Sequence, residues 1–386
     1  MLAIGLFATL CANVFINGVA FMIPRLHTEY GLSLARSGLI SAMPSFGAVL
    51  TLILWGYLVD RVGERRVLAL GSALTATAAG AAAMSHSLVS TSAFLFLGGM
   101  AAASSNSASG RLVVGWFEPR QRGLAMGIRQ TAQPLGVGVG ALVIPGLAQN
   151  HGLPVALGFP AIVCAIAAVV CAVAVQDPPR PARHEAPSEQ LANPYRGSTL
   201  LVRIHIVSLL LVIPQAVVWT FALVWLMLDR GWSAGSAGAL ITVAQVLAAL
   251  GRVTVGRWSD RIGSRLQPIR LIGAAAVAAM LLLALTDSLG STWSVAMLIV
   301  ASVVTVCDNG LAFTAIAEFA GPFWSGRALG TQNTSQFLMA GLAPPLFGAL
   351  IGAAGYPAAF VVCALLALVA IPLVPPDPDR APAPGV

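Results

Sequence analysis

The sequence consists of long apolar blocks separated by short polar turns. Twelve blocks, each near or above the length of a membrane-spanning helix, cover roughly 1–24, 36–58, 67–85, 88–115, 123–149, 154–175, 200–228, 236–258, 268–286, 290–316, 326–353 and 357–375. About 20 apolar residues in a helix cross the ~30 Å hydrocarbon layer, and spanning segments are helical because their backbone groups must pair internally. The pattern predicts an all-α polytopic membrane protein with twelve transmembrane helices, the first of them a retained helix rather than a signal peptide.

Composition supports a lipid environment and removes several classes of function. The chain of 386 residues is 58% hydrophobic and 9% charged, which leaves too few charges to cover a soluble globule. All 21 basic residues are Arg, so a phosphate-loop Lys and Schiff-base chemistry are excluded. The arginines are scattered over short loops and form no basic face, so we expect no binding of nucleic acid. The five cysteines lie inside apolar blocks without metal-ligand spacing. Gly136 to Ala141 matches a dinucleotide pattern but lacks the preceding strand. We expect no enzyme activity, cofactor or metal.

Two short charged turns repeat 200 residues apart. Gly56-Tyr57-Leu58-Val59-Asp60-Arg61-Val62-Gly63-Glu64-Arg65-Arg66 lies between two apolar blocks, and so does Gly256-Arg257-Trp258-Ser259-Asp260-Arg261-Ile262-Gly263. Both contain the frame Gly-x-x-x-Asp-Arg-x-Gly, which indicates two related halves. This frame resembles the loop signature of the major facilitator superfamily, although Glu64 stands where a basic residue is usual and the second copy is degenerate.

The resemblance implies a fold of two pseudo-symmetric six-helix bundles and a conformational latch at the charged turns. In that latch Asp60 would lie near Gly326, at the start of helix eleven, and Arg111 would pair with Asp60. The predicted latch residues are Gly56, Asp60, Arg61, Gly63, Arg66, Arg111, Gly256, Asp260 and Arg261.

A second repeat gives the alignment of the halves. Residues 123–133 match 326–336 at an offset of 203, sharing two Gly, one Ala, one Thr and the last Gln. We therefore predict an N-terminal bundle at 1–175, a cytoplasmic linker at 176–199 and a C-terminal bundle at 200–386. With both termini cytoplasmic, fifteen arginines lie in inner loops and tails, and only Arg25, Arg36 and Arg230 lie outside. This bias predicts that orientation in an inner or plasma membrane, and we expect a monomer.

Arg129 is the first candidate for substrate contact. An ionised side chain inside the bilayer should face a cavity or a partner, because its burial in hydrocarbon is costly. Gln133 lies one turn further along, and Gln332 and Gln336 occupy the equivalent positions of the other half. The alternative is that Arg129 reaches the interface or forms a packing ion pair; for Arg111 and Arg252, nearer the cytoplasmic helix ends, that alternative is preferred.

Asp308 is the candidate for proton coupling. A short carboxylate cannot reach the interface from the middle of helix ten, so we expect it to face a central cavity where desolvation favours its neutral form. A structural Asp, bonded to a hydroxyl or paired with Arg, is the alternative. Other polar side chains on the apolar blocks are predicted to complete the cavity, although each alone is more often an interhelical hydrogen bond: Asn13, Asn17, Asn106, Gln215, Trp219 and Gln245.

These features favour a secondary transporter that moves a small solute by alternating access, through proton-coupled symport of a small organic anion. A proton-driven exporter of amphipathic compounds is the alternative within transport, and a membrane sensor that moves no solute is the alternative from another class. The expected partners are the substrate, protons and the lipid bilayer.

Overall fold

The computed structural model describes residues 1–386 apart from 118, 179–192, 197, 322–323 and 378–386, and gives only the backbone of 60, 114, 119–124 and 325–326. Every regular element in the described part of the chain is a helix. In chain order these are α1 (Leu2–Gly18), η1 (Val19–Met22), α2 (Ile23–Thr28), α3 (Leu34–Val62), α4 (Glu64–Ala83), α5 (Leu88–Trp116), α6 (Pro119–Gln130), α7 (Ala132–His151), α8 (Leu153–Ala174), α10 (Leu200–Val224), η3 (Trp225–Asp229), α11 (Ala234–Ile262), α12 (Leu266–Ser288), α13 (Trp293–Val304), α14 (Cys307–Ala320) and α15 (Ser325–Leu373).

Twelve helical passes follow from these elements. Eleven continuous helical stretches are long and apolar enough to cross a membrane, and the last of them, Arg327–Leu373, is 47 residues long. Within it Gly355 has φ 80° and ψ 173°, a left-handed backbone conformation that glycine adopts without strain. The chain reverses there, so α15 is two consecutive helices. The predicted number of helices and the all-α class are confirmed.

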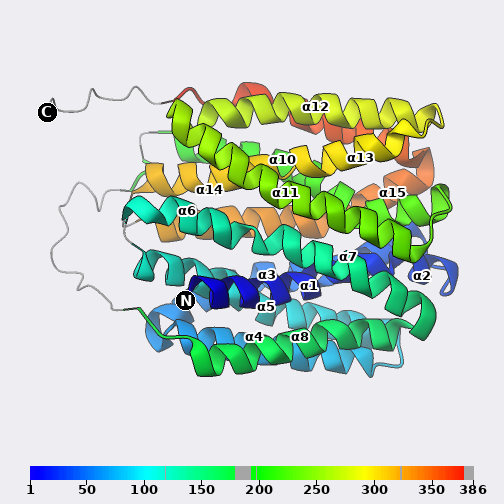
Figure 1. The fold of residues 1–386 in the computed structure, drawn as a ribbon, viewed down its shortest axis with the longest axis horizontal. Helices are drawn as coiled ribbons and strands as arrows, with labels where there is room; N and C mark the ends of the chain where they lie inside the picture. Colours follow the sequence, from blue (N-terminus) through cyan, green and yellow to red (C-terminus); the bar gives the residue numbers. More distant parts are fainter. Residues whose placement is uncertain (118, 179–192, 197, 322–323, 378–386) are drawn as a thin grey trace, which may run out of the picture.

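The helices form two bundles that lie side by side (Figure 1). Helices α1 to α8 gather in one half of the view and α10 to α15 in the other, with α6, α7 and α11 along the boundary. In the first bundle α4 packs against α5 and α8, and in the second α15 packs against α10 and α12. The exact division at residues 175 and 200 stays a prediction, because most of the predicted linker lies outside the described residues.

Helix breaks occur in both halves. The fifth pass is interrupted at Thr131, between α6 and α7, and the tenth at Thr305 and Val306, between α13 and α14. A further irregularity is the π-helical turn η3, which ends the seventh pass. Such breaks expose backbone groups and are tolerated in a membrane where protein or a cavity surrounds them. The break at Thr131 lies beside the cavity described below.

The two bundles touch most closely at one end of the molecule. A Cβ atom added to Gly38 on α3 would lie 2.5 Å from the Pro344 carbonyl oxygen on α15, and one added to Gly238 on α11 would lie 2.1 Å from that of Ala141 on α7. Glycine therefore allows backbone-to-backbone approach at both crossings. Thr242 Oγ1 also donates to the Gly138 carbonyl across the same boundary, at 2.8 Å. These contacts close the predicted outer half of the molecule.

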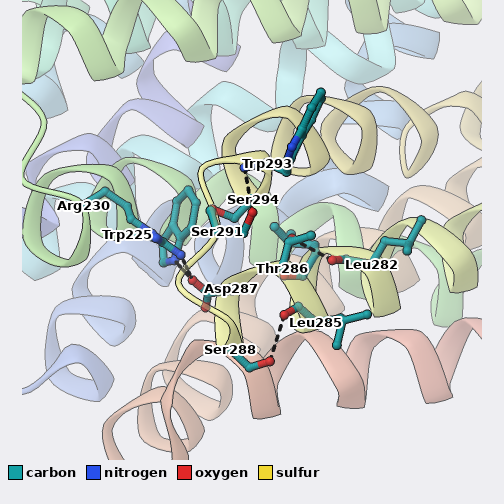
Figure 2. Close-up of polar contacts among 11 residues, drawn as sticks. Trp225, Arg230, Leu282, Leu285, Thr286, Asp287, Ser288, Ser291, Trp293 and Ser294 are labelled. Atoms are coloured by element: carbon teal, nitrogen blue, oxygen red, sulfur yellow. Dashed lines mark hydrogen bonds and ion pairs between the residues drawn. The ribbon is translucent and has the colours of Figure 1, made fainter.

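A polar cluster joins the seventh and ninth passes at their predicted outer ends (Figure 2). The Trp225 indole Nε1 donates to Asp287 Oδ1 at 3.0 Å, and Arg230 forms an ion pair with the same carboxylate. The Arg230 guanidinium also lies 4.8 Å from the centre of the Trp225 ring. The Asp287 side chain is only 6% exposed, so its charge is neutralised by Arg230 rather than by solvent. We call these three residues the outer staple.

Candidate functional site

A cavity of about 960 Å³, part of it open to solvent, lies between the two bundles. It is lined by helices of both halves, chiefly α1, α3, α6 and α7 from the first and α10 and α15 from the second. The lining residues are Thr9, Asn13, Ile16, Asn17, Ala20, Ser41, Ser45, Asn106, Arg129, Gln130, Gln133, Val212, Gln215, Ala216, Trp219, Thr220, Phe313, Asn333, Gln336, Phe337, Ala340 and Pro344. Among these described residues only Arg129 carries a formal charge.

Arg129 is held at the cavity wall by uncharged groups. Its Nε donates to Ser109 Oγ at 3.0 Å and its Nη2 to the Asn106 carbonyl oxygen at 2.9 Å. The residue is only 6% exposed, and none of its hydrogen bonds reaches an acidic side chain in the described part of the chain. A buried cation without a counter-charge is costly, so the arrangement favours an anion in the cavity.

The structure brings eight of the ten predicted binding residues to this cavity: Asn13, Asn17, Asn106, Arg129, Gln133, Gln215, Trp219 and Gln336. Gln245 and Gln332 lie outside the described lining. Gln245 is buried against Gly138 of the other bundle, where its Cβ lies 3.4 Å from the position of an added glycine Cβ. Contact of any of the ten with a substrate stays a prediction.

Gln332 belongs to a buried hydrogen-bond chain next to the cavity. His205 Nδ1 lies 2.8 Å from Gln332 Oε1, and the Gln332 amide donates to Ser208 Oγ. The chain continues to the cavity through Gln336, whose Nε2 donates to Ser208 Oγ at 2.9 Å and to Asn309 Oδ1 at 2.5 Å. At its other end the His205 ring meets the Tyr195 hydroxyl at 3.0 Å. Sequence reasoning missed His205, although it is the one histidine within an apolar block.

Arg252 links the two bundles at the break in the fifth pass. Its Nη1 donates to the Gln130 carbonyl oxygen at 2.9 Å, and its Nη2 lies 3.4 Å from Gln133 Oε1. Its Nε donates to the Val306 carbonyl oxygen at the break in the tenth pass, at 3.1 Å. Sequence reasoning preferred an interfacial or packing role for Arg252. The structure shows that it is 7% exposed and joins the backbones of both broken helices.

Asp308 lies in the first turn of α14 and is 4% exposed. It does not line the main cavity, contrary to the expected position. It packs instead beside Ser208, the start of α12 and the end of α15, among described residues that are otherwise apolar and leave no room for a water molecule. Asp308 directly follows the break in the tenth pass. Arg252 is the nearby charged side chain that acts on it electrostatically.

The two charged turns are bound within their own halves. The Arg65 backbone N–H donates to Asp177 Oδ1 at 2.7 Å, and Arg111 Nε lies 3.4 Å from Glu64 Oε1. Sequence reasoning gave Arg111 the partner Asp60, whose side chain lies outside the described part, so that pair and its position near Gly326 stay predictions. The ion-pair partner that the structure shows for Arg111 is Glu64, the residue that departs from the family signature.

In the second turn Arg265 binds Glu318 at 3.0 Å and also Asp260. Burial lowers the pKa of Arg265, but its hydrogen bonds to Glu318 and Asp260 outweigh this and leave the pKa above its ordinary value. Gly63, a predicted latch residue, and Gly263 follow α3 and α11 with φ of 93° and 68°, which explains glycine at both positions. Gly56, Arg61, Arg66, Gly256 and Arg261 lie on the same turns, and a latch role for any of them stays a prediction.

Comparison with known proteins agrees with this architecture. The family model of the Major Facilitator Superfamily matches residues 5–344. The chain belongs to this superfamily. An MFS-type transporter of Mycobacterium tuberculosis (strain ATCC 25618 / H37Rv) is 58% identical over 375 residues, which cover 97% of this chain and 84% of that protein.

Two more distant similarities add detail. A gallate transporter of Pseudomonas putida is 27% identical over an alignment that covers 91% of this chain and 85% of the relative. Among solved structures, an inward-facing bacterial homologue of the human lysosomal transporter Spinster matches with a TM-score of 0.75 at 15% identity, covering 96% of this chain and 95% of that one. The latter match shows the fold alone. The protein is therefore a multi-pass membrane transporter of the Major Facilitator Superfamily.

Proposed function

We propose that this transporter carries a small organic anion by alternating access. The observation that supports the proposal is the charge of the cavity: Arg129 is the one formally charged residue in the described lining, and its partners are neutral. A guanidinium fork binds a carboxylate through two parallel hydrogen bonds. The name of the gallate transporter, an organic-anion carrier similar over most of the chain, supports the same class.

The test is counterflow in proteoliposomes with matched probes. Labelled benzoate, its neutral methyl ester and the cation benzylammonium differ mainly in charge at one end. We expect unlabelled carboxylate inside the vesicles to drive uptake of labelled benzoate and of neither other probe beyond the leak of protein-free vesicles. Counterflow of the ester or the cation at the rate of benzoate would contradict the proposal. That result would favour export of amphipathic compounds, for which Trp219, Phe313 and Phe337 provide apolar surface.

We further propose that transport is symport with protons and that Asp308 is the coupling residue. Support comes from its burial and from its place beside Ser208, which also accepts a hydrogen bond from the cavity residue Gln336. A carboxyl group that exchanges a proton in one conformation only would tie solute movement to the gradient. In this conformation Asp308 is closed off from water, so the exchange would occur in another conformation of the cycle.

We propose a location in the plasma membrane, the inner membrane where there are two, with both termini cytoplasmic. The test labels introduced cysteines. The five native cysteines are all buried and should therefore react little with the label. Single cysteines introduced by Ser198→Cys and Thr292→Cys should be labelled by an impermeant maleimide from opposite faces of the membrane, because an odd number of passes separates them. Labelling of both from the same face would contradict this orientation.

A further inference from the structure

The glutamines beside Arg129 have their amide oxygens turned toward arginines. Gln130 Oε1 lies 3.4 Å from Arg129 Nη1, and Gln133 Oε1 lies 3.4 Å from Arg252 Nη2. A guanidinium has donors and no acceptor, so these contacts fix which end of each amide is oxygen. The NH₂ groups of both glutamines are therefore the ends left for a ligand. Together with Arg129 they make this side of the cavity rich in donors.

Two asparagines elsewhere in the lining are oriented the opposite way. Asn17 Nδ2 donates to the Asn13 carbonyl oxygen at 3.3 Å, and Asn333 Nδ2 donates to the Leu329 carbonyl oxygen at 3.0 Å. A backbone carbonyl can only accept, so the amide nitrogens are committed to these bonds. Asn17 and Asn333 thus keep Oδ1 as an acceptor for a ligand. They belong to α1 and α15, one in each bundle.

Two further donors lack a protein partner. Asn106 Nδ2 and Trp219 Nε1 are buried, and neither forms a hydrogen bond with any described residue. Both residues line the cavity, again one from each bundle. A buried donor without an acceptor costs free energy, and each such group requires an explanation. A ligand that has acceptor oxygens at two places would explain both unpaired donors.

We infer that the transported anion is a hydroxylated carboxylate rather than a simple one. The inference rests on the proposed function. Arg129, Gln130 and Asn106 supply donors for the two carboxylate oxygens. A hydroxyl group both donates and accepts, so it fits a place where Asn333 or Asn17 offers an oxygen and Trp219 offers an N–H. A carboxylate without hydroxyl groups leaves the buried Trp219 N–H without an acceptor and does not use the part-buried Asn17 and Asn333 oxygens. A site built to bond a hydroxyl rejects an analogue that lacks it in this way.

The experiment measures binding of matched ligand pairs by isothermal titration calorimetry on the purified full-length protein. One pair is 3,4,5-trihydroxybenzoate and benzoate; the other is glucuronate and cyclohexanecarboxylate. We expect the wild type to bind the hydroxylated member of at least one pair ten or more times more tightly. Asn333→Leu removes one acceptor and should reduce that preference 2–10-fold while leaving the affinity for the plain carboxylate within twofold.

Two further variants make the result interpretable. Thr75→Val removes a buried hydroxyl that donates to the Gly71 carbonyl oxygen within α4 and lies outside the described lining, so it should keep the wild-type preference. Asn17→Leu tests the other acceptor and replaces Asn333→Leu if that variant does not fold. Equal binding of both members of each pair by the wild type would overturn the inference, and so would an unchanged preference in the folded asparagine variants.

Failure of the proposed function gives a different result. In that case no carboxylate binds the wild type, or Arg129→Gln binds the carboxylates as tightly as the wild type does. Carboxylate binding that depends on Arg129 but ignores hydroxyl groups would leave the proposed function intact and reject only the substrate class.

Discussion

The two halves share a scaffold but differ in chemistry at equivalent positions. At the offset of 203 residues Arg129 corresponds to Gln332. Arg129 lies at the cavity wall with Ser109 and the Asn106 carbonyl as partners, whereas Gln332 is fully buried and faces His205 and Ser208. The two positions therefore share a place in the repeat but differ in charge and in partners. A symmetric fold needs only one such difference to give its central cavity a net positive charge.

The largest expected effect comes from making the first half like the second. Arg129→Gln should weaken binding of 3,4,5-trihydroxybenzoate by about 100-fold or more, because it removes two charge-assisted hydrogen bonds worth about 1.5–3 kcal/mol each. Arg129→Lys should cost about tenfold, since a point charge keeps the attraction and loses the fork. Calorimetry measures both constants. An equal loss for the neutral methyl ester would assign Arg129 to packing instead.

The second comparison concerns Asp308 and its counterpart Ser105. Asp308→Asn is nearly isosteric and permanently neutral, so we expect it to abolish accumulation driven by an imposed pH gradient. Exchange of labelled for unlabelled substrate at equal pH should stay within about twofold of wild type, because exchange requires no net proton movement. Both assays use the same proteoliposomes. Ser105→Ala is the matched control and should leave gradient-driven uptake unchanged; continued accumulation by Asp308→Asn would make Asp308 structural.

The helices and the halves were predictable because both depend on patterns along the chain. Apolar length determines a membrane pass, and a repeated frame of Gly, Asp and Arg indicates duplication. Even the reversal at Gly355 falls in the expected gap between the last two apolar blocks. The position of eight of the ten predicted residues at the cavity was also predictable, because a polar side chain on a membrane helix is stable only against protein or a water-filled cavity.

The contacts between helices were less predictable, because sequence does not fix helix rotation or breaks. Gln332 and Asn333 are adjacent, yet only Asn333 lines the cavity, and sequence reasoning chose Gln332. Arg252 meets the Gln130 carbonyl oxygen beside the break at Thr131, where Pro134 offers no backbone N–H to that oxygen. Asp308 follows the break before α14 and lies outside the main cavity. Each miss is a rotation or a kink that residue spacing cannot reveal.

The outer staple provides a stability comparison between the halves. Asp287 corresponds by the offset to Met84, which has no charge to pair. Asp287→Asn removes the ion pair and leaves the Arg230 guanidinium without its carboxylate, so we expect a loss of about 1–3 kcal/mol in the free energy of unfolding. A thiol-reactive dye can report thermal unfolding through the five buried cysteines. Met84→Leu should change the midpoint little, and an unchanged midpoint in Asp287→Asn would show that the staple contributes no stability.

The smallest expected effects separate Gln133 from its counterpart Gln336. The Gln133 amide keeps its NH₂ for a ligand, whereas Gln336 donates to Asn309 Oδ1 and Ser208 Oγ within its own half. Gln133→Leu should therefore weaken ligand binding 2–10-fold, the value of one neutral hydrogen bond, and leave the unfolding midpoint nearly unchanged. Gln336→Leu should lower the midpoint, because it removes the donor to the buried Asn309 Oδ1, and change the dissociation constant less than twofold. If both substitutions weaken binding equally, the halves contribute alike to recognition, and the difference between a binding half and a supporting half is limited to Arg129.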